Sequence, residues 1–420
     1  MIYFWLVLLW LATAIRWRID LGFISFAFVE PVAIITIVVL LVNQYTRKRR
    51  VTIVAEPVAL LLIVFGFWVI VVRVWGQNTI NSLSDIRDWL IPICTYVVLI
   101  STIKRGWRKL VLLFVAVGFL SALLGLYQFF TDSFRPFSTE GAAFKAGYII
   151  VAGSSFEPIS AALAFFEHPN SLAVYLILAL TISLGWWQEG NQRVLKIAVM
   201  SILFAALLST YAKAEIIAFV LIVILYVLSW FIRSPKIFGL TAVGLIGVGV
   251  ASIWIGMKII PQYFGTFWWR VTLWDTAVKV ITMNPAILIW GNGNIIFAQN
   301  AIWPQPHNLF IDILLKYGLI GLIILGTIGW ILLRYGFIAY RHSINRQFVI
   351  MRAVWMSLLI FGITGLVESS FISIETRMIF VLTMACTIGL IREVLFESKF
   401  AEKRPEELVG QLWIAKSTTS

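Results

Sequence analysis

Two of the three histidines in the chain stand directly before apolar segments, among residues that favour the start of a helix. His307 is followed by Asn308, and His168 is followed by Pro169 and Asn170. Proline fits the first turn of a helix, and an asparagine side chain can cap the free backbone N–H groups there. A histidine beside a positive helix end can accept a proton near neutral pH, while that helix end attracts phosphate. The spacing therefore points to acid–base chemistry next to an anion.

Each histidine also has a structural interpretation. His307 is a candidate general base, but an interfacial histidine that caps a helix or contacts lipid headgroups would leave the same pattern. His168 is more simply explained as a structural residue that orients the preceding loop against the membrane. We therefore keep His307 as the candidate catalytic residue and His168, with Asn170, as supporting residues.

Arg270 and Lys213 are the cations that we expect to hold a phosphate group. The stretch 268–283 has helical spacing, which places Trp274 one turn after Arg270, within reach of a cation–π contact. A guanidinium can grip phosphate through two hydrogen bonds, whereas the ammonium of Lys213 acts as a point charge. The alternative for Arg270 is anchoring to lipid headgroups, and the alternative for Lys213 is pairing with a nearby acid. Asp312 and Lys316 have i,i+4 spacing, and we expect them to pair.

The elements that position these residues must be membrane helices. The 420 residues are 61% hydrophobic and 13% charged, a balance that no soluble fold tolerates. The apolar runs are continuous rather than alternating, which favours helices over a β-barrel. Since a spanning helix needs about 20 mostly apolar residues, we predict an all-α, polytopic membrane helical bundle of about 12 transmembrane helices. Its long outer loop is predicted to contain an interfacial helix, residues 268–283, with tryptophan at headgroup depth.

The apolar runs give approximate bounds for these helices. The expected spans lie near 1–15, 28–44, 54–74, 87–103, 110–130, 169–187, 195–210, 214–232, 237–257, 308–333, 350–367 and 376–393. Glu30 and Glu56 each precede a proline at the start of a span, and we interpret them as helix caps rather than catalysts. Residues 1–15 include a possible signal-peptide cleavage site at Ala12-Thr13-Ala14. No positively charged region precedes the apolar run, however, so we predict a retained span.

Positive charge sets the expected orientation. With a cytoplasmic N-terminus, most of the 33 Lys and Arg residues fall in inner segments, as the positive-inside rule requires, although Arg16 and Arg18 do not. Residues 1–393 then form a single membrane domain with long outer loops at about 131–168 and 258–306, and residues 394–420 form a cytoplasmic tail. The net charge of +13 reflects the Lys and Arg residues kept on the cytoplasmic side rather than nucleic-acid binding. The candidate residues fall on the outer face, so their chemistry would use neither ATP nor sugar nucleotides.

Three motifs occur in a fixed order along the chain. The first, at the start of a middle span, is His168-Pro169-Asn170. The second is an outer arginine and tryptophan followed by asparagine-proline and a glycine turn, namely Arg270, Trp274, Asn284, Pro285, Gly291 and Gly293. The third is His307-Asn308, which enters a helix that ends in Gly-Leu-Ile-Gly at 318–321. In order, spacing and expected location these motifs resemble the O-antigen ligase and polysaccharide polymerase superfamily of bacterial membrane glycosyltransferases, most specifically over 270–321.

The resemblance implies an enzyme of the bacterial inner membrane with its active site on the outer face. Such enzymes take a glycan from an undecaprenyl diphosphate carrier and join it to an acceptor, which is a saccharide or a lipid-linked glycan, without a metal or other cofactor. It implies that His307 is the base that deprotonates the acceptor hydroxyl and that Arg270, with Lys213 and Asn308, binds the donor diphosphate. Trp274 would support Arg270. The implied partners are thus donor, acceptor and membrane lipids.

Two positions depart from the family pattern. Ala212-Lys213 stands where the family often has serine-arginine, so the charge is kept but the two-pronged grip is lost. Lys316, two residues before Gly318, reverses the charge of the glutamate that the family often has there. Details of the substrate can therefore differ.

Other function classes leave different patterns. A transporter or flippase of lipid-linked saccharides would place charges and broken helices near the membrane midplane, whereas the notable polar residues here gather at the outer rim. A sensor or scaffold would need no aligned base and cations. A metal-dependent glycosyltransferase would want an acidic pair in the first outer loop, where Asp20 stands alone, and the two cysteines, Cys94 and Cys386, lie in apolar runs and offer no metal cluster. The sequence does not separate ligase from polymerase.

Overall fold

The computed structural model describes most of the chain, and every statement below refers to that part. The described residues are 2–15, 18–20, 25–48, 56–75, 79–131, 145–149, 157–164, 166, 169–188, 191–232, 234, 237–241, 244–245, 247–248, 251, 255, 258, 265–301, 305–342, 349–366 and 373–401.

Helices make up nearly all of the described structure, as the sequence predicts. The helices of the bundle are α1 (Ile2–Ala14), α2 (Val29–Lys48), α3 (Pro57–Trp75), α4 (Thr79–Thr102), α5 (Trp107–Thr131), α6 (Pro169–Trp187), α7 (Arg193–Ser209), α8 (Lys213–Phe231), α13 (Leu309–His342), α14 (Val349–Gly365) and α15 (Ile374–Ala401). Three further helices lie between α8 and α13: α10 (Gly265–Met283) and the short helices α11 (Ala286–Trp290) and α12 (Asn294–Asn300). Two small antiparallel sheets pair β1 (Arg18–Asp20) with β2 (Ser25–Ala27) and β3 (Lys145–Ile149) with β4 (Glu157–Ser160).

The polytopic membrane class follows from the length and composition of these helices. Among the described residues, seven helices (α2, α3, α5, α6, α8, α13 and α15) are long and apolar enough to cross a membrane, and α1 and α14 are shorter apolar helices. The expected span at 237–257 is described only in part, so the number of about 12 stays a prediction. α15 runs on to Ala401, past residue 394, where the sequence places the start of the tail.

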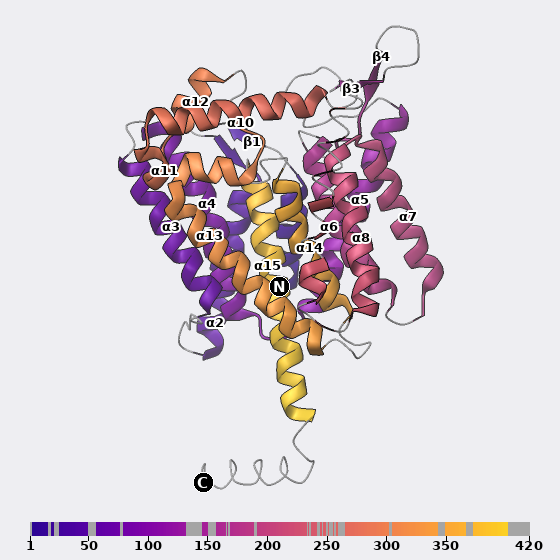
Figure 1. Ribbon diagram of the computed structural model, residues 1–420. Coiled ribbons are helices and arrows are strands. Elements are labelled where there is room, and N and C mark those ends of the chain that lie inside the picture. The colour runs from indigo at the N-terminus through magenta and orange to yellow at the C-terminus, as the bar shows by residue number, and fades with distance from the viewer. Residues whose placement is uncertain are drawn as a thin grey trace.

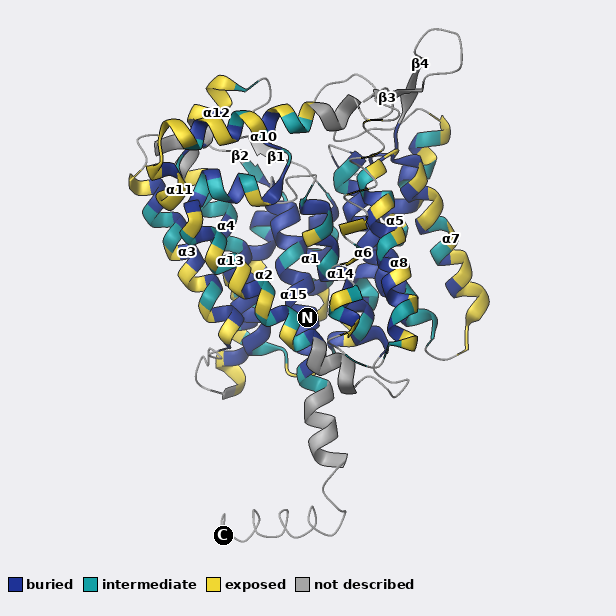
Figure 2. Ribbon diagram, in the orientation of Figure 1, coloured by how far each residue is buried: buried dark blue, intermediate teal, exposed yellow. Residues whose placement is uncertain are grey.

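The bundle packs around α6, α14 and α15. Small residues allow close approach: a Cβ at Gly185 of α6 would lie 2.6 Å from the Cβ of Ala353 in α14, and one at Gly118 of α5 would lie 2.7 Å from that of Ala179 in α6. The membrane-length window of α15 is 94% buried inside the protein, and Figure 2 shows its middle enclosed by neighbouring helices. These helices form the protein-facing interior, while the exposed apolar residues of helices such as α2, α3 and α7 are suited to face lipid.

A second, smaller core lies at one end of the bundle. Figure 1 shows α10 lying across this end, whereas the C-terminal end of α15 projects beyond the opposite end. Leu273, Ala277 and Val280 of α10 pack with Ile287 of α11, with Phe297 of α12 and with Leu315 of α13. We call α10, α11, α12 and residues 309–317 of α13 the cap, the end that carries it the cap end, and the opposite end the tail end. The cap is thus a separate apolar cluster.

α13 is broken at Gly318, which corrects the prediction of one continuous span from 308 to 333. Gly318 has φ 67° and ψ −172°, a left-handed, non-helical conformation that glycine adopts readily. In Figure 1 the part before Gly318 lies across the bundle beneath α10, and the longer part descends towards the tail end. The Gly-Leu-Ile-Gly motif therefore marks a kink inside α13 and not the end of the helix.

The glycine turn at 291–294 packs against the backbone of this kink. The break exposes carbonyl groups of α13, which accept hydrogen bonds from Gly293 N (to Leu315 O, 2.8 Å), from Asn292 N (to Lys316 O, 3.2 Å) and from the Trp68 indole (to Tyr317 O, 2.8 Å). A Cβ on Gly291 would lie 2.6 Å from Gly318 N. The turn thus satisfies the backbone that the kink exposes, and α12 follows it as a short helix that the sequence does not reveal.

The two glutamates that precede prolines cap their helices, as predicted. Glu30 accepts a hydrogen bond from Ala27 N at 2.7 Å, and Glu56 accepts one from Ala59 N at 2.8 Å. Each is buried and has a further role, since Glu30 pairs with Arg87 at 3.1 Å and Glu56 accepts a hydrogen bond from the Tyr96 hydroxyl at 3.0 Å. Through these further contacts, Glu30 joins α2 to α4 and Glu56 joins the start of α3 to α4.

Candidate functional site at the cap end

His307 stands at the entrance to the first part of α13, in an unusual backbone conformation. Its φ is 48°, in the left-handed region that few non-glycine residues adopt. The side chain is partly exposed, so it is accessible to a substrate. Strained backbone of this kind persists only where surrounding contacts hold it, and it clusters at functional sites. The backbone conformation of His307 is therefore consistent with a functional position.

Asn308 fixes the helix start behind His307. Its Oδ1 accepts hydrogen bonds from Phe310 N (3.0 Å) and Ile311 N (3.1 Å), which is the predicted cap. Its Nδ2 donates to the carbonyl of Leu366, just beyond α14, at 2.8 Å. The buried amide is thus engaged on both sides, which gives Asn308 a positioning role and leaves its predicted diphosphate contact a prediction.

A hydrogen bond joins α10 to the residue before His307. The Trp274 indole donates a hydrogen bond to the carbonyl of Pro306, the residue before His307, at 2.9 Å. Arg270 lies one turn earlier on α10, so its side chain starts about 5–6 Å from that of Trp274 on the same face. Arg270 is partly exposed. The cap thereby brings an arginine, a tryptophan and a histidine to one region, as the sequence predicts for Arg270, Trp274 and His307.

The remaining predicted site residues are distributed differently. Lys213 is the first residue of α8 and is exposed, and α8 packs against α6 and α14 rather than being part of the cap. Asn170 lies in the first turn of α6 and is partly buried. His168 lies outside the described residues. The structure thus does not place Lys213 or Asn170 in the cap, and the roles of these three residues stay predictions.

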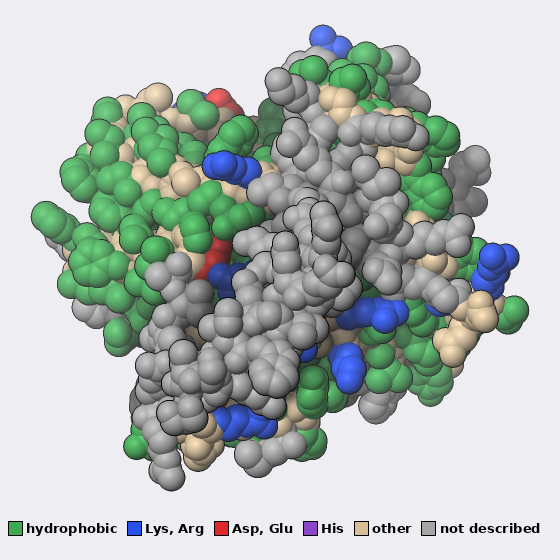
Figure 3. All heavy atoms as spheres, turned by 90° about the horizontal axis from the view of Figure 1, so that it is seen from below, with side chains coloured by type: hydrophobic (Ala, Val, Ile, Leu, Met, Phe, Trp, Pro, Cys, Tyr) green, Lys and Arg blue, Asp and Glu red, His purple; other side chains and the backbone are tan. Residues whose placement is uncertain are grey.

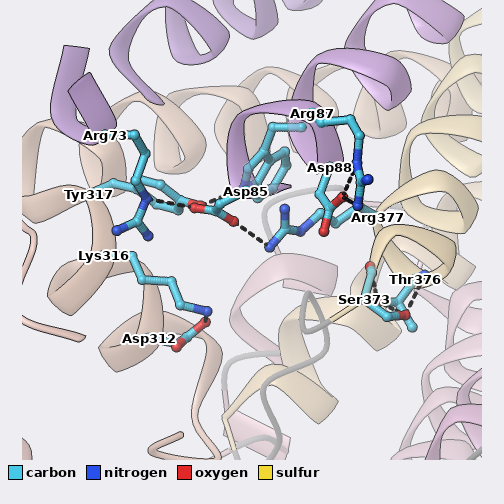
Figure 4. A network of polar contacts seen from close by, with 11 residues as sticks. Arg73, Asp85, Arg87, Asp88, Asp312, Lys316, Tyr317, Ser373, Thr376 and Arg377 are labelled. Carbon is cyan, nitrogen blue, oxygen red and sulfur yellow. Dashed lines mark hydrogen bonds and ion pairs between the residues drawn. The ribbon is translucent and has the colours of Figure 1, made fainter. Parts of the chain in front are cut away.

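A buried network of charged side chains lies beneath the cap, and it was not predicted from the sequence. The Asp85 carboxylate accepts hydrogen bonds from Arg377 Nη2 (3.0 Å), Arg73 Nε (2.8 Å) and the Tyr317 hydroxyl (2.6 Å). Trp89 Nε1 donates to the Tyr317 hydroxyl at 2.7 Å. Figure 4 shows these side chains converging from α3, α4, α13 and α15. Asp85 is thus the shared counter-charge of two guanidinium groups.

The network and the Asn308 cap fix the two ends of one short helix. Residues 309–317 begin at Asn308, bonded to Leu366, and end at Tyr317, bonded to Asp85 and Trp89. Between them Lys316 Nζ pairs with Asp312 at 2.8 Å, as predicted, and both side chains are largely buried. This short helix is therefore anchored at both ends, which fixes the backbone that follows His307.

The sequence carries one signal for this network. Arg73, Asp85 and Arg377 each lie near the cap end of a helix of the bundle, where a buried charged side chain must pair or face a cavity. No spacing rule connects them, because they lie far apart in the sequence. Among the described residues, no group of three or more His, Cys, Asp or Glu side chains is arranged to hold a metal ion; whether the reaction needs a metal stays a matter of prediction.

Residues 197–326 match the family model described as O-antigen ligase. The matched segment runs from α7 to beyond the kink of α13 and contains Lys213, Arg270, Trp274, His307 and Asn308, whereas Arg73, Asp85 and Arg377 lie outside it. No curated protein matches the chain. The family-model match confirms the resemblance inferred from the sequence, which is to the O-antigen ligase and polysaccharide polymerase superfamily.

Proposed function

We propose that the protein is a membrane glycosyltransferase of the O-antigen ligase type. It transfers or polymerises a glycan from undecaprenyl diphosphate onto an acceptor sugar, and the cap end is the outer face of a bacterial inner membrane. The observation that carries this proposal is the placement of His307: a left-handed residue at a capped helix start, tied through Pro306 to the helix of Arg270. The family match over the same segment supports it.

The proposed reaction needs one base and a stabilised leaving group. The acceptor hydroxyl attacks the anomeric carbon of the donor glycan, and His307 takes the hydroxyl proton as the new C–O bond forms. The bond between the anomeric carbon and the phosphate oxygen breaks, and its electron pair leaves with undecaprenyl diphosphate. Arg270 and Lys213 offset the charge on that diphosphate, with the positive start of α13 nearby. His307 later releases its proton to solvent.

Deletion of the gene separates the possible functions. If surface glycans are missing and single repeat units remain on the carrier at the outer face, the protein is a polymerase. If long chains remain on the carrier there, it is a ligase. A flippase would instead leave its substrate on the cytoplasmic leaflet, and normal surface glycans would contradict the proposal altogether.

The orientation gives a prediction for accessibility. In a background where Cys94 and Cys386 are replaced by serine, cysteines at Lys145 and Asn300 should react with an impermeant thiol reagent added to intact cells whose outer membrane has been made permeable. A cysteine at Ser234, between α8 and the next segment, should react only after the inner membrane is opened. Figure 3, a view of the tail end, shows Lys and Arg side chains spread over this face, which supports its assignment as the cytoplasmic face. Labelling of Ser234→Cys alone would invert the orientation and remove the proposed mechanism.

Arg270 gives a second test. We expect Arg270→Ala to lower the transfer rate about ten- to a hundredfold, because a charged hydrogen-bond partner of the diphosphate contributes about 1.5–3 kcal/mol. Arg270→Lys should keep part of the activity, since a point charge replaces the two-pronged grip. The matched control is Lys279→Ala, which removes an exposed cation of the same helix that pairs with Asp275 at 2.6 Å. Equal activities of the two alanine variants would make Arg270 a headgroup anchor.

A further inference from the structure

A cavity of about 360 Å³ opens at the tail end, between α1, α2 and the turn from α4 to α5. It lies at the opposite end of the bundle from His307, so the proposed transfer reaction does not use it. Its volume falls within the roughly 300–1,000 Å³ of small-molecule sites. Its lining divides into a polar part and an apolar part, and each indicates a different portion of a ligand.

The polar part of the lining is strongly cationic. Arg47 near the end of α2 and Lys104 and Arg105 in the α4–α5 turn line the cavity together with the amides of Asn43 and Gln44. No carboxylate is among its described lining residues. Three cations from two segments, with two amides that can donate hydrogen bonds, form a site for a phosphate group.

The apolar part is formed by membrane helices. Leu6 of α1, Leu40 of α2 and Leu110 of α5 line the same cavity. Phe4 and Val42, neighbours of lining residues on α1 and α2, are exposed apolar side chains of the kind that face lipid. A ligand in this cavity therefore contacts both cations and apolar side chains.

The turn that supplies two of the cations is held in place. Gly106 has φ 92°, and a Cβ there would lie 2.9 Å from the Tyr3 hydroxyl of α1. Gly106 N donates to the carboxylate of Glu393 on α15. Lys109 lies over the Tyr3 ring at 5.9 Å. The turn is thus fixed against α1 and α15, and Lys104 and Arg105 are presented to the cavity without the ordering cost of a mobile loop.

We propose that this cavity binds the phosphodiester headgroup of an anionic phospholipid from the cytoplasmic leaflet. Basic pockets between membrane helices on that side suit such headgroups, and the combination of cations with an apolar wall distinguishes a lipid from free phosphate. The site is separate from glycan transfer and would hold α1 and α2 against the α4–α5 turn.

The test compares lipid binding by full-length protein in detergent. Wild type, a cavity variant (Arg47→Gln, Lys104→Gln, Arg105→Gln) and a control (Arg108→Gln, Arg193→Gln, Arg334→Gln) are each delipidated and mixed with phosphatidylglycerol, phosphatidylcholine or inorganic phosphate. The control removes the same charge from residues that do not line the cavity. Bound lipid is counted by native mass spectrometry, and the shift in Tm on adding each ligand shows that the variants fold.

We expect wild type and control to retain phosphatidylglycerol over phosphatidylcholine and to gain Tm with it. In the cavity variant the preference should fall about fivefold for each cation removed. Equal losses in both triple variants would overturn the proposal in favour of a diffuse positive face. A third outcome is that inorganic phosphate raises the Tm as much as phosphatidylglycerol does, with the gain lost in the cavity variant. That result would overturn the proposed lipid ligand and identify a site for free phosphate. None of these outcomes depends on transferase activity.

Discussion

A protein that carries His307→Asn should fold, bind the lipid-linked donor and transfer almost no glycan. Loss of a general base typically slows a reaction by about 10²–10⁴-fold. Asparagine is the informative replacement because it tolerates the left-handed conformation that His307 adopts, with φ 48°, but cannot accept the proton. His307→Ala removes the same chemistry and adds backbone strain, so the difference between the two variants isolates the contribution of the backbone.

The measurement is transfer by purified protein, run beside donor binding. Near-normal transfer by His307→Asn would remove His307 from the mechanism. Donor binding that falls in parallel with turnover would make His307 a binding residue instead.

The second large effect concerns stability, and it comes from Asp85. Asp85→Asn should lower the free energy of unfolding by about 3–5 kcal/mol, because the guanidinium groups of Arg73 and Arg377 lose their shared buried counter-charge. The Tyr317 hydroxyl, which donates to Asp85 at 2.6 Å, would lose a charged acceptor as well. Unfolding in mixed detergent micelles measures this change.

The matched control for Asp85 is Asp275→Asn. Asp275 pairs with Lys279 at 2.6 Å, but both side chains are more than half exposed, at 58% and 64%. An exposed i,i+4 pair contributes only about 0.3–0.5 kcal/mol. Transfer by Asp85→Asn, measured below its lowered Tm, should fall far less than in His307→Asn, since Asp85 supports the short helix but does not touch the reacting groups. Equal stability of the Asp85→Asn and Asp275→Asn variants would mean that the network contributes little.

The sequence predicted the helical membrane class and most helix positions because continuous apolar runs report directly on burial in lipid. It also predicted local features whose partners are three or four residues apart: the caps by Glu30, Glu56 and Asn308 and the pair of Asp312 with Lys316. Each depends on neighbouring residues alone, so one sequence is sufficient to find it.

Features that depend on distant partners were missed. Asp85 and Arg377 are 292 positions apart, and no pattern in one sequence joins them. The kink at Gly318 depends on the turn at Gly291, since each glycine leaves room for the backbone of the other segment. Hydropathy alone gives one long span over 309–336, because leucine and isoleucine flank the break on both sides. Tertiary packing, rather than local sequence preference, determines the pairing of Asp85 with Arg377 and the kink at Gly318.

The fit between Gly291 and Gly318 has a mechanical consequence for substrate entry. Under the proposed function, a polyprenyl carrier reaches the cap end from within the bilayer and passes sideways between α10 and the bundle. The glycine contact and the hydrogen bonds of Asn292 N and Gly293 N fasten the C-terminal side of α10, through α11, to α13, and the Trp68 indole ties α13 to α3. Separating this side would break these hydrogen bonds, which costs free energy. For the proposed donor we therefore expect entry at the other side of α10, near its start, where Arg270 is the first cation of that helix.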